Sequence, residues 1–192
     1  HGKRFNVVKL GEDNAGFGYL LSYMTKYAKS REFDKYIFCD DDVLGFKFRN
    51  KQSTLIREIK TMNDLMDDNG YSQLMMSFSA HNWFHEGNLK EKIGAWCFVI
   101  NKTADIIASG GYDSELPIFN DWDMSARLIT QGYKTACYYG AMFNHKMKSR
   151  EGGAESVYED KGNLKLASDL LIERYGVDCI KKVEAHGQEE VR

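Results

Sequence analysis

Hydrophobic residues recur along the chain with two different periods, and stretches of the two kinds alternate. Apolar residues three or four positions apart predict helices over residues 18–30, 54–68, 105–109, 121–131 and 162–175. Short apolar runs predict strands over residues 5–10, 36–39, 74–79, 96–100 and 135–139. Strands that alternate with helices are typical of an α/β domain built on a largely parallel sheet.

Composition narrows the class of protein. The chain has 192 residues, of which 43% are hydrophobic, enough for one globular core, so we expect a single domain over residues 1–192. The net charge of −2 gives no overall basic field for nucleic acid or a membrane. No apolar run approaches the roughly 20 residues of a membrane span, so we expect no membrane partner. Composition does not indicate an oligomeric state.

The cysteines indicate a reducing compartment. The chain has four, and no two of them form a CxxC pair. Cys39, Cys97 and Cys137 lie in apolar or aromatic contexts, which predicts core thiols rather than a disulfide framework. We therefore expect the protein in the cytoplasm.

An acidic run follows one predicted strand. Residues 36–43 read Tyr-Ile-Phe-Cys-Asp-Asp-Asp-Val. Three adjacent carboxylates repel one another and lose hydration if the strand end is buried. A divalent cation would neutralise them, because Mg²⁺ and Mn²⁺ prefer carboxylate oxygen. The run therefore indicates either a metal and phosphate site, at the edge where α/β sheets bind ligands, or a solvated polar turn.

Further motifs follow in a definite order. They are the Asn14-x-Gly16 loop, the acidic run, Gly94-Ala95-Trp96, Gly110-Gly111-Tyr112-Asp113, Asn120-Asp121-Trp122-Asp123 and His145. Over residues 5–150 this order resembles the GT-A fold nucleotide-sugar glycosyltransferases. The resemblance implies an α/β fold with a Rossmann-type sheet and flanking helices. Because the first predicted strand begins at residue 5, we expect a chain that lacks the first βαβ unit of this fold, as an N-terminally incomplete fragment would.

The resemblance implies a split metal site for Mn²⁺ or Mg²⁺. In the family the acidic DxD motif binds the metal that grips the donor's pyrophosphate, and Asp40 and Asp42 fit this motif. Asp42 is the expected direct ligand, and Asp40 is expected nearer the ribose or a metal-bound water. His145, in a polar loop after the predicted strand 135–139, matches the family's late metal ligand, although a lone histidine in such a loop is more often a surface residue.

The resemblance also implies nucleotide contacts. Asn14 and Gly16 are expected to approach the nucleotide of a UDP-sugar, since glycine allows the backbone to come close. Asp41 is grouped with these residues without a specific role. Lys146 and Lys148 belong to a basic loop suited to fold over a diphosphate; a solvated charged loop is the alternative.

The segment Asn120-Asp121-Trp122-Asp123 resembles the family's Glu-Asp-x-Asp segment, with Asn at the first position. The resemblance implies that Asp121 is the general base of an inverting transferase, which deprotonates an acceptor hydroxyl. The alternative is that Asn120, Asp121 and Asp123 cap the helix and complement its dipole. Both roles are compatible, with Asp123 as the cap or orienting residue.

The acceptor is inferred from a narrower resemblance. The chain is similar to the TET/JBP-associated glycosyltransferases of phages and kinetoplastids, which act on hydroxymethylated pyrimidines in DNA. This implies modified DNA as a partner, in a host cytoplasm or a nucleus, and local basic patches such as Lys47, Arg49, Lys51 and Arg57. Two alternatives remain open: a glycan, lipid or small-molecule acceptor, and a non-catalytic nucleotide-binding module.

Overall fold

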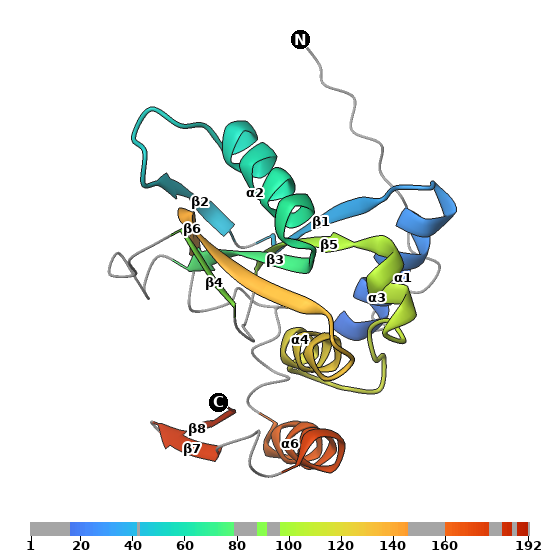
Figure 1. The fold of residues 1–192 in the computed structure, drawn as a ribbon. Helices are drawn as coiled ribbons and strands as arrows, with labels where there is room; N and C mark the ends of the chain where they lie inside the picture. Colours follow the sequence, from blue (N-terminus) through green and yellow to red (C-terminus); the bar gives the residue numbers. More distant parts are fainter. Residues whose placement is uncertain are drawn as a thin grey trace.

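The computed structural model describes residues 16–41, 43–78, 88–91, 97–145, 160–176, 182–185 and 188–191 (Figure 1). Its helices are α1 (Phe17–Ser30), α2 (Leu55–Asn69), α3 (Thr103–Ala108), α4 (Asn120–Thr130) and α6 (Lys161–Tyr175). Its strands are β1 (Lys35–Cys39), β2 (Val43–Phe48), β3 (Tyr71–Phe78), β4 (Leu89–Glu91), β5 (Phe98–Lys102), β6 (Lys134–His145), β7 (Lys182–Ala185) and β8 (Gln188–Val191). The five predicted helices are all present, and the α/β class is confirmed.

The described residues form a six-stranded sheet and a separate β7–β8 hairpin. The strand order of the sheet is β1-β5-β3-β6-β2, with β4 also beside β6. Of the pairings among described residues, only β3 with β6 is parallel. The prediction of a largely parallel sheet is therefore wrong, because apolar runs do not encode strand direction. Since β5 is antiparallel to both β1 and β3, the strands β1, β3 and β6 still run the same way, and their carboxyl ends share one edge.

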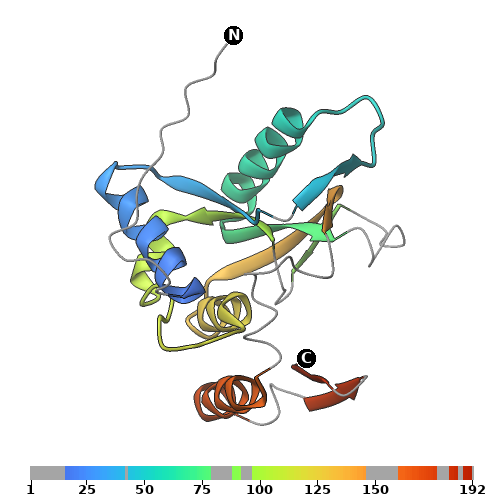
Figure 2. The ribbon, with the colours of Figure 1, turned by 180° about the vertical axis from the view of Figure 1, so that it is seen from behind.

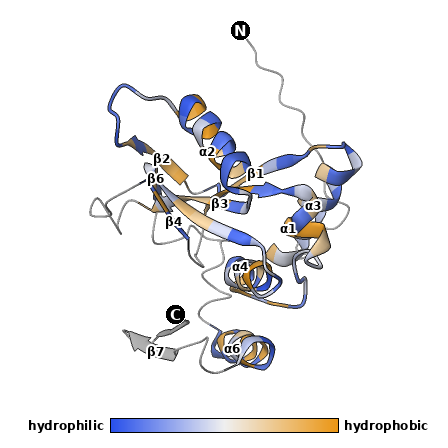
Figure 3. Ribbon diagram, viewed as in Figure 1, coloured by the Kyte–Doolittle hydropathy of each residue, from blue (hydrophilic) through white to orange (hydrophobic). Residues whose placement is uncertain are grey.

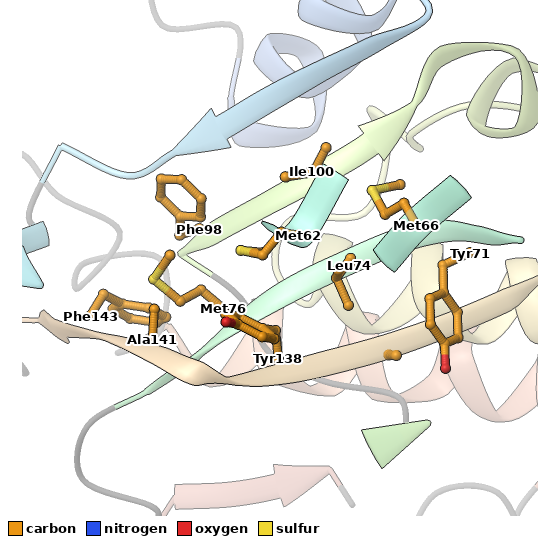
Figure 4. Close-up of a cluster of buried hydrophobic side chains, with 11 residues drawn as sticks. Met62, Met66, Tyr71, Leu74, Met76, Phe98, Ile100, Tyr138, Ala141 and Phe143 are labelled. Atoms are coloured by element: carbon orange, nitrogen blue, oxygen red, sulfur yellow. The ribbon is translucent and has the colours of Figure 1, made fainter. Parts of the chain in front are cut away.

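Helices cover both faces of this sheet. Figures 1 and 2 show α2 on one face and α1, α3 and α4 on the other, with α6 beyond α4. The core under α2 includes Met62, Leu74 and Ile100, and Figure 4 shows these side chains between the helix and the strands. In the same core Tyr138 donates a hydrogen bond of 2.5 Å to Glu58, which satisfies a buried carboxylate.

The core on the opposite face is built from Leu21, Phe38, Val99, Ile106 and Met124. These five residues come from α1, β1, β5, α3 and α4. A third cluster joins α6 to the segment that leads into α4, through buried apolar residues of both. These clusters explain why α1, α2 and α4 have hydrophobic residues mainly along one side and hydrophilic residues along the other (Figure 3).

Local signals set the ends of two helices. The Thr54 hydroxyl accepts a hydrogen bond from the Arg57 amide at the start of α2, and Gly70 ends this helix in the left-handed region with φ 68°. The Asp160 carboxylate accepts from the Gly162 amide and caps α6. None of the helices within the described ranges combines the length and the apolar character needed to cross a membrane.

Three further expectations need correction. The strands β2, β4, β7 and β8 were not predicted, and β6 continues beyond Tyr139 to His145. His145 therefore belongs to a strand rather than to a loop, because pairing with β2 extends β6. Cys39 is exposed, since it alternates with buried Phe38 on β1, whereas Cys97 is half-buried and Cys137 is buried. The predicted strand at residues 5–10 lies outside the described residues.

Candidate functional site

The acidic run forms a tight turn at the carboxyl end of β1. The Asp40 amide donates to the Cys97 carbonyl at 2.8 Å, which ties the turn to the start of β5. The Asp41 amide donates to the Asp40 carboxylate at 3.1 Å. Asp40 is half-buried and Asp41 is exposed, while Asp42 lies outside the described residues. The turn therefore holds one carboxylate in place and leaves its neighbour in solvent.

The end of β6 lies beside this turn. Val43, the first residue of β2, pairs with His145 in the antiparallel register. This pairing brings the backbone of His145 beside the residue that directly follows the acidic run. The His145 side chain lies outside the description. Carboxylate oxygen with an imidazole suits Mn²⁺, so the residues at this edge fit the expected cation.

Within the described ranges, no three acidic, histidine or cysteine side chains form a metal-holding group. That finding does not include Asp42 or the His145 side chain, so the metal site stays a prediction. Asn14, Lys146 and Lys148 also lie outside the described residues. Gly16 is described: it is exposed and precedes α1 with φ 85°, a conformation that favours glycine.

The first turn of α1 lies against the end of β1. The ring of Phe17, the first residue of α1, contacts the edge of the Phe38 ring with centroids 5.6 Å apart. Phe38 is two residues before Asp40, so the helix begins next to the acidic turn. Its N-cap residue, Gly16, has no side chain that could cap the helix. Its first amides carry partial positive charge and are suited to a phosphate.

The first turn of α4 also lies against the start of α1. A Cβ placed on Gly18 would lie 2.3 Å from the Asp113 carbonyl oxygen and 2.8 Å from Asn120 Oδ1. This close approach requires glycine at position 18. Asp121 follows Asn120 on the first turn of α4 and is half-buried. Phe38, two residues before Asp40, and Asn120, which precedes Asp121, therefore contact the same turn of α1.

None of the acidic residues of α4 occupies its N-cap position. The N-cap position is Phe119, and no side-chain hydrogen bond caps the helix. The Asn120 amide donates instead to the Leu116 carbonyl at 3.0 Å. Asp121 and Asp123 lie in the first turn, where a negative charge complements the helix dipole. Of the alternatives for this segment, the orienting role of Asp123 agrees with the structure and the side-chain cap does not.

A buried polar cluster lies beneath Asp121. Burial, then the neighbouring Tyr36, and finally the charge of Asp121 raise the pKa of Tyr112 well above its usual value. Tyr36 shares a hydrogen bond of 2.7 Å with Thr25, and burial raises its pKa to about 12. The cluster links β1, α1 and the Gly111-Tyr112-Asp113 segment. The phenols nearest to Asp121 are therefore uncharged at neutral pH.

Two residues of α6 bind the segment around Asp121. Arg174 pairs with Asp113 and, at 2.9 Å, with Asp123. The Tyr175 hydroxyl donates to Asp123 at 2.8 Å. Burial disfavours the charged Asp113 carboxylate, but the hydrogen bonds from Arg174 and from the Glu115 amide outweigh this and lower its pKa. An open groove of about 570 Å³ runs beside these residues, lined by Gly110, Tyr112, Asp113, Ser114, Glu115, Arg127, Arg174 and Tyr175.

The sequence reasoning missed Gly18, Asp113, Arg174 and Tyr175 as parts of this site. Asp113 belongs to a recognised motif, but its partner is 61 positions away. Gly18 follows the recognised Asn14-x-Gly16 motif by two residues. This second glycine was the signal that could have pointed to a close approach at position 18. Arg174 and Tyr175 look in sequence like the polar end of an ordinary amphipathic helix.

Comparison with solved structures supports the fold. The chain is similar to S. aureus TarS 1-349 with UDP-GlcNAc (TM-score 0.56, 14% identity, 87% of this chain and 50% of that chain). It is also similar to the TarS complex with UDP (TM-score 0.52, 14% identity, 85% and 47%). TarS is a glycosyltransferase of the GT-A type, so the expected GT-A-like fold is confirmed. The chain spans about half the length of these TarS structures.

No protein-family model and no curated protein sequence matches the chain. The narrower resemblance to the TET/JBP-associated enzymes therefore stays a prediction.

Proposed function

We propose that this chain is a metal-dependent glycosyltransferase that moves a sugar from a UDP-sugar to a hydroxyl acceptor. The observation that carries the proposal is that the first turn of α1 contacts both the end of β1 and the first turn of α4. Phe17 joins it to the end of β1, where Asp40 follows, and Gly18 joins it to Asn120, where Asp121 follows. Asp40 and Asp121, the proposed metal-binding carboxylate and the proposed base, thus lie within two residues of side chains that contact the first turn of α1, in a fold similar to that of a UDP-GlcNAc complex.

The reaction follows from this arrangement. The acceptor oxygen attacks the anomeric carbon of the sugar, and its proton passes to the Asp121 carboxylate. The bond from that carbon to the β-phosphate oxygen breaks, and its electron pair leaves with UDP. Attack on the face opposite to the leaving group inverts the anomeric configuration.

The donor would be held by its diphosphate. Mn²⁺ or Mg²⁺ held there would supply Lewis-acid stabilisation of the negative charge that develops on UDP. Asp40, Asp42 and His145 are the residues proposed to hold it. The first amides of α1 after Gly16 would meet the phosphate oxygens. Asn14, Asp41, Lys146 and Lys148 are proposed as further donor contacts.

UDP release from a panel of UDP-sugars, with Mn²⁺ or Mg²⁺ and with a chelator, tests this proposal. We expect release with metal and its loss with the chelator. Asp40→Asn should lower the rate by about 100-fold, the order of effect expected when charge stabilisation at the leaving group is lost. Asp68→Asn, an exposed acid of α2, is the matched control and should not change the rate. Equal rates for both variants would contradict the assignment of the acidic turn.

We also propose that the acceptor hydroxyl is that of a 5-hydroxymethylpyrimidine in DNA. Lys47, Arg49, Lys51 and Arg57 are all exposed, on β2, on its connection to α2 and on α2 itself. Because β2 leaves directly from the acidic turn, Lys47 is about 13 Å along the strand from Val43. DNA phosphates bound there would bring a base edge within reach of the site.

Duplexes with and without hydroxymethylcytosine or hydroxymethyluracil separate the acceptor classes. We expect modified DNA, and not unmodified DNA, to accelerate UDP release. The double variant Lys47→Glu, Arg57→Glu should abolish this acceleration and leave UDP release without DNA unchanged. Lys165→Glu, at an exposed position of α6, should change neither rate. Acceleration by a glycan or a small alcohol but not by modified DNA would overturn the DNA proposal and keep the transferase.

A further inference from the structure

One side chain of α6 holds both ends of the segment that carries Asp121. Arg174 pairs with Asp113, where the segment begins, and with Asp123, on the first turn of α4. Asp121 lies between these two carboxylates in sequence, two residues from the second. The guanidinium fork can meet two carboxylates at once in a fixed geometry, which a lysine cannot do. Arg174 therefore fixes the distance between the two ends of this segment.

Asp123 is the better buried of the two carboxylates. Its side chain is 2% exposed and also receives hydrogen bonds from Arg127 and Tyr175. A buried carboxylate with this many donors has one position available to it. The backbone of α4 next to Asp121 is held by that position.

The segment between the two carboxylates packs against α6. Phe119 has φ 63°, in the left-handed region that a phenylalanine rarely adopts. Leu116 and Ile118 are buried against Ala167 and Leu171 of α6. The conformation of this segment thus depends on the docking of α6, to which Arg174 contributes the polar part.

We propose that Arg174 is a positioning residue for Asp121: by bridging Asp113 and Asp123 it holds the first turn of α4 so that the Asp121 carboxylate meets the acceptor hydroxyl. The inference rests on the proposed transferase function and adds a residue from outside the recognised motifs. Arg174 touches neither donor nor acceptor in this scheme. It acts through the placement of the base, where a small displacement has a large effect on rate.

A double-mutant cycle with Asp121 tests the inference. UDP release from UDP-GlcNAc with Mn²⁺, with water as the acceptor, is measured per UDP-binding site counted by calorimetry, so that unfolded protein does not contribute. Arg174→Met should lower kcat by about 10- to 100-fold, with KM for UDP-GlcNAc within about 2-fold. Arg174→Lys should give an intermediate kcat, since it keeps the charge and loses the fork. In the Asp121→Asn background, Arg174→Met should have an effect below about 2-fold.

The controls separate this inference from the proposed function. Lys165→Met removes an exposed ion pair with Asp169 on the same helix and should leave kcat unchanged. If Asp121→Asn alone leaves kcat unchanged, the base assignment fails and the inference fails with it. If Asp121→Asn abolishes release but Arg174→Met either has no effect or lowers the residual rate by its full factor, the inference alone is overturned.

Discussion

Gly18 lies where the first turns of α1 and α4 meet. The Asp113 carbonyl oxygen would be 2.3 Å from a Cβ at this position, and it is a backbone atom. A backbone atom cannot rotate away as the end of a side chain can, so any larger residue must push the two segments apart. Close packing of this kind makes interiors sensitive to a single added carbon.

We therefore expect Gly18→Ala to lower the free energy of unfolding by about 1–3 kcal/mol, as measured by urea denaturation. UDP binding should weaken as well, because the α1 start would move. Gly45→Ala is the matched control, since a Cβ there has no neighbour within 4 Å; its unfolding free energy should change by less than about 0.5 kcal/mol. Equal effects of the two variants would contradict the close approach of α1 and α4.

Helix α6 docks on α4 through paired charges as well as apolar contacts. Asp113 pairs with Arg174 of this helix. Burial would raise the pKa of Asp113, but the hydrogen bonds from Arg174 and the Glu115 amide outweigh it and lower the pKa below the usual 3.8. A carboxyl group whose pKa is lower in the folded state stabilises the fold above its unfolded-state pKa. That contribution is lost as pH falls through the lower folded-state pKa.

The difference in unfolding free energy between wild type and Asp113→Asn should thus be constant above about pH 5 and shrink on acidification below about pH 4. Urea denaturation of both proteins from about pH 3 to neutral pH measures it. A difference that grows as the pH falls would contradict the ion pair between Asp113 and Arg174.

Helix periodicity was sufficient to locate all five helices, because each buries one apolar stripe. Strand prediction was less complete. The segment Leu89–Glu91 has one apolar residue in three, and Val43–Phe48 is half exposed with a glycine within it, so neither has the apolar run of a buried strand. The direction of β5 and the extension of β6 depend on pairing partners that are distant in sequence.

The candidate site was predicted only in part, because some of its contacts also join residues that are distant in sequence. The acidic run and Asp121 stand in recognisable motifs, and residues within two positions of Asp40 and of Asp121 contact the first turn of α1. Arg174 could not be found, because its importance comes from two carboxylates at positions 113 and 123 that only the docking of α6 brings to it. Long-range polar contacts leave no periodic trace in a sequence.

In the molecule as a whole, the elements of the site gather at one edge of the sheet. Strands β1 and β6 end there, Phe17 of α1 contacts Phe38 near the end of β1, and the first turn of α4 lies against the first turn of α1. Open α/β sheets bind ligands at this edge. The exposed basic residues on β2 and α2 extend from the same edge, which is why donor and acceptor proposals involve adjacent surfaces.

The most direct test of the central claim compares UDP-GlcNAc turnover with UDP binding in wild type and Asp121→Asn, both with Mn²⁺. If Asp121 is the base of a sugar transfer, the variant should bind UDP with a Kd within about 2-fold of wild type and lose turnover by at least about 100-fold, the lower range for loss of general base catalysis. Turnover by the variant at the wild-type rate would contradict the account.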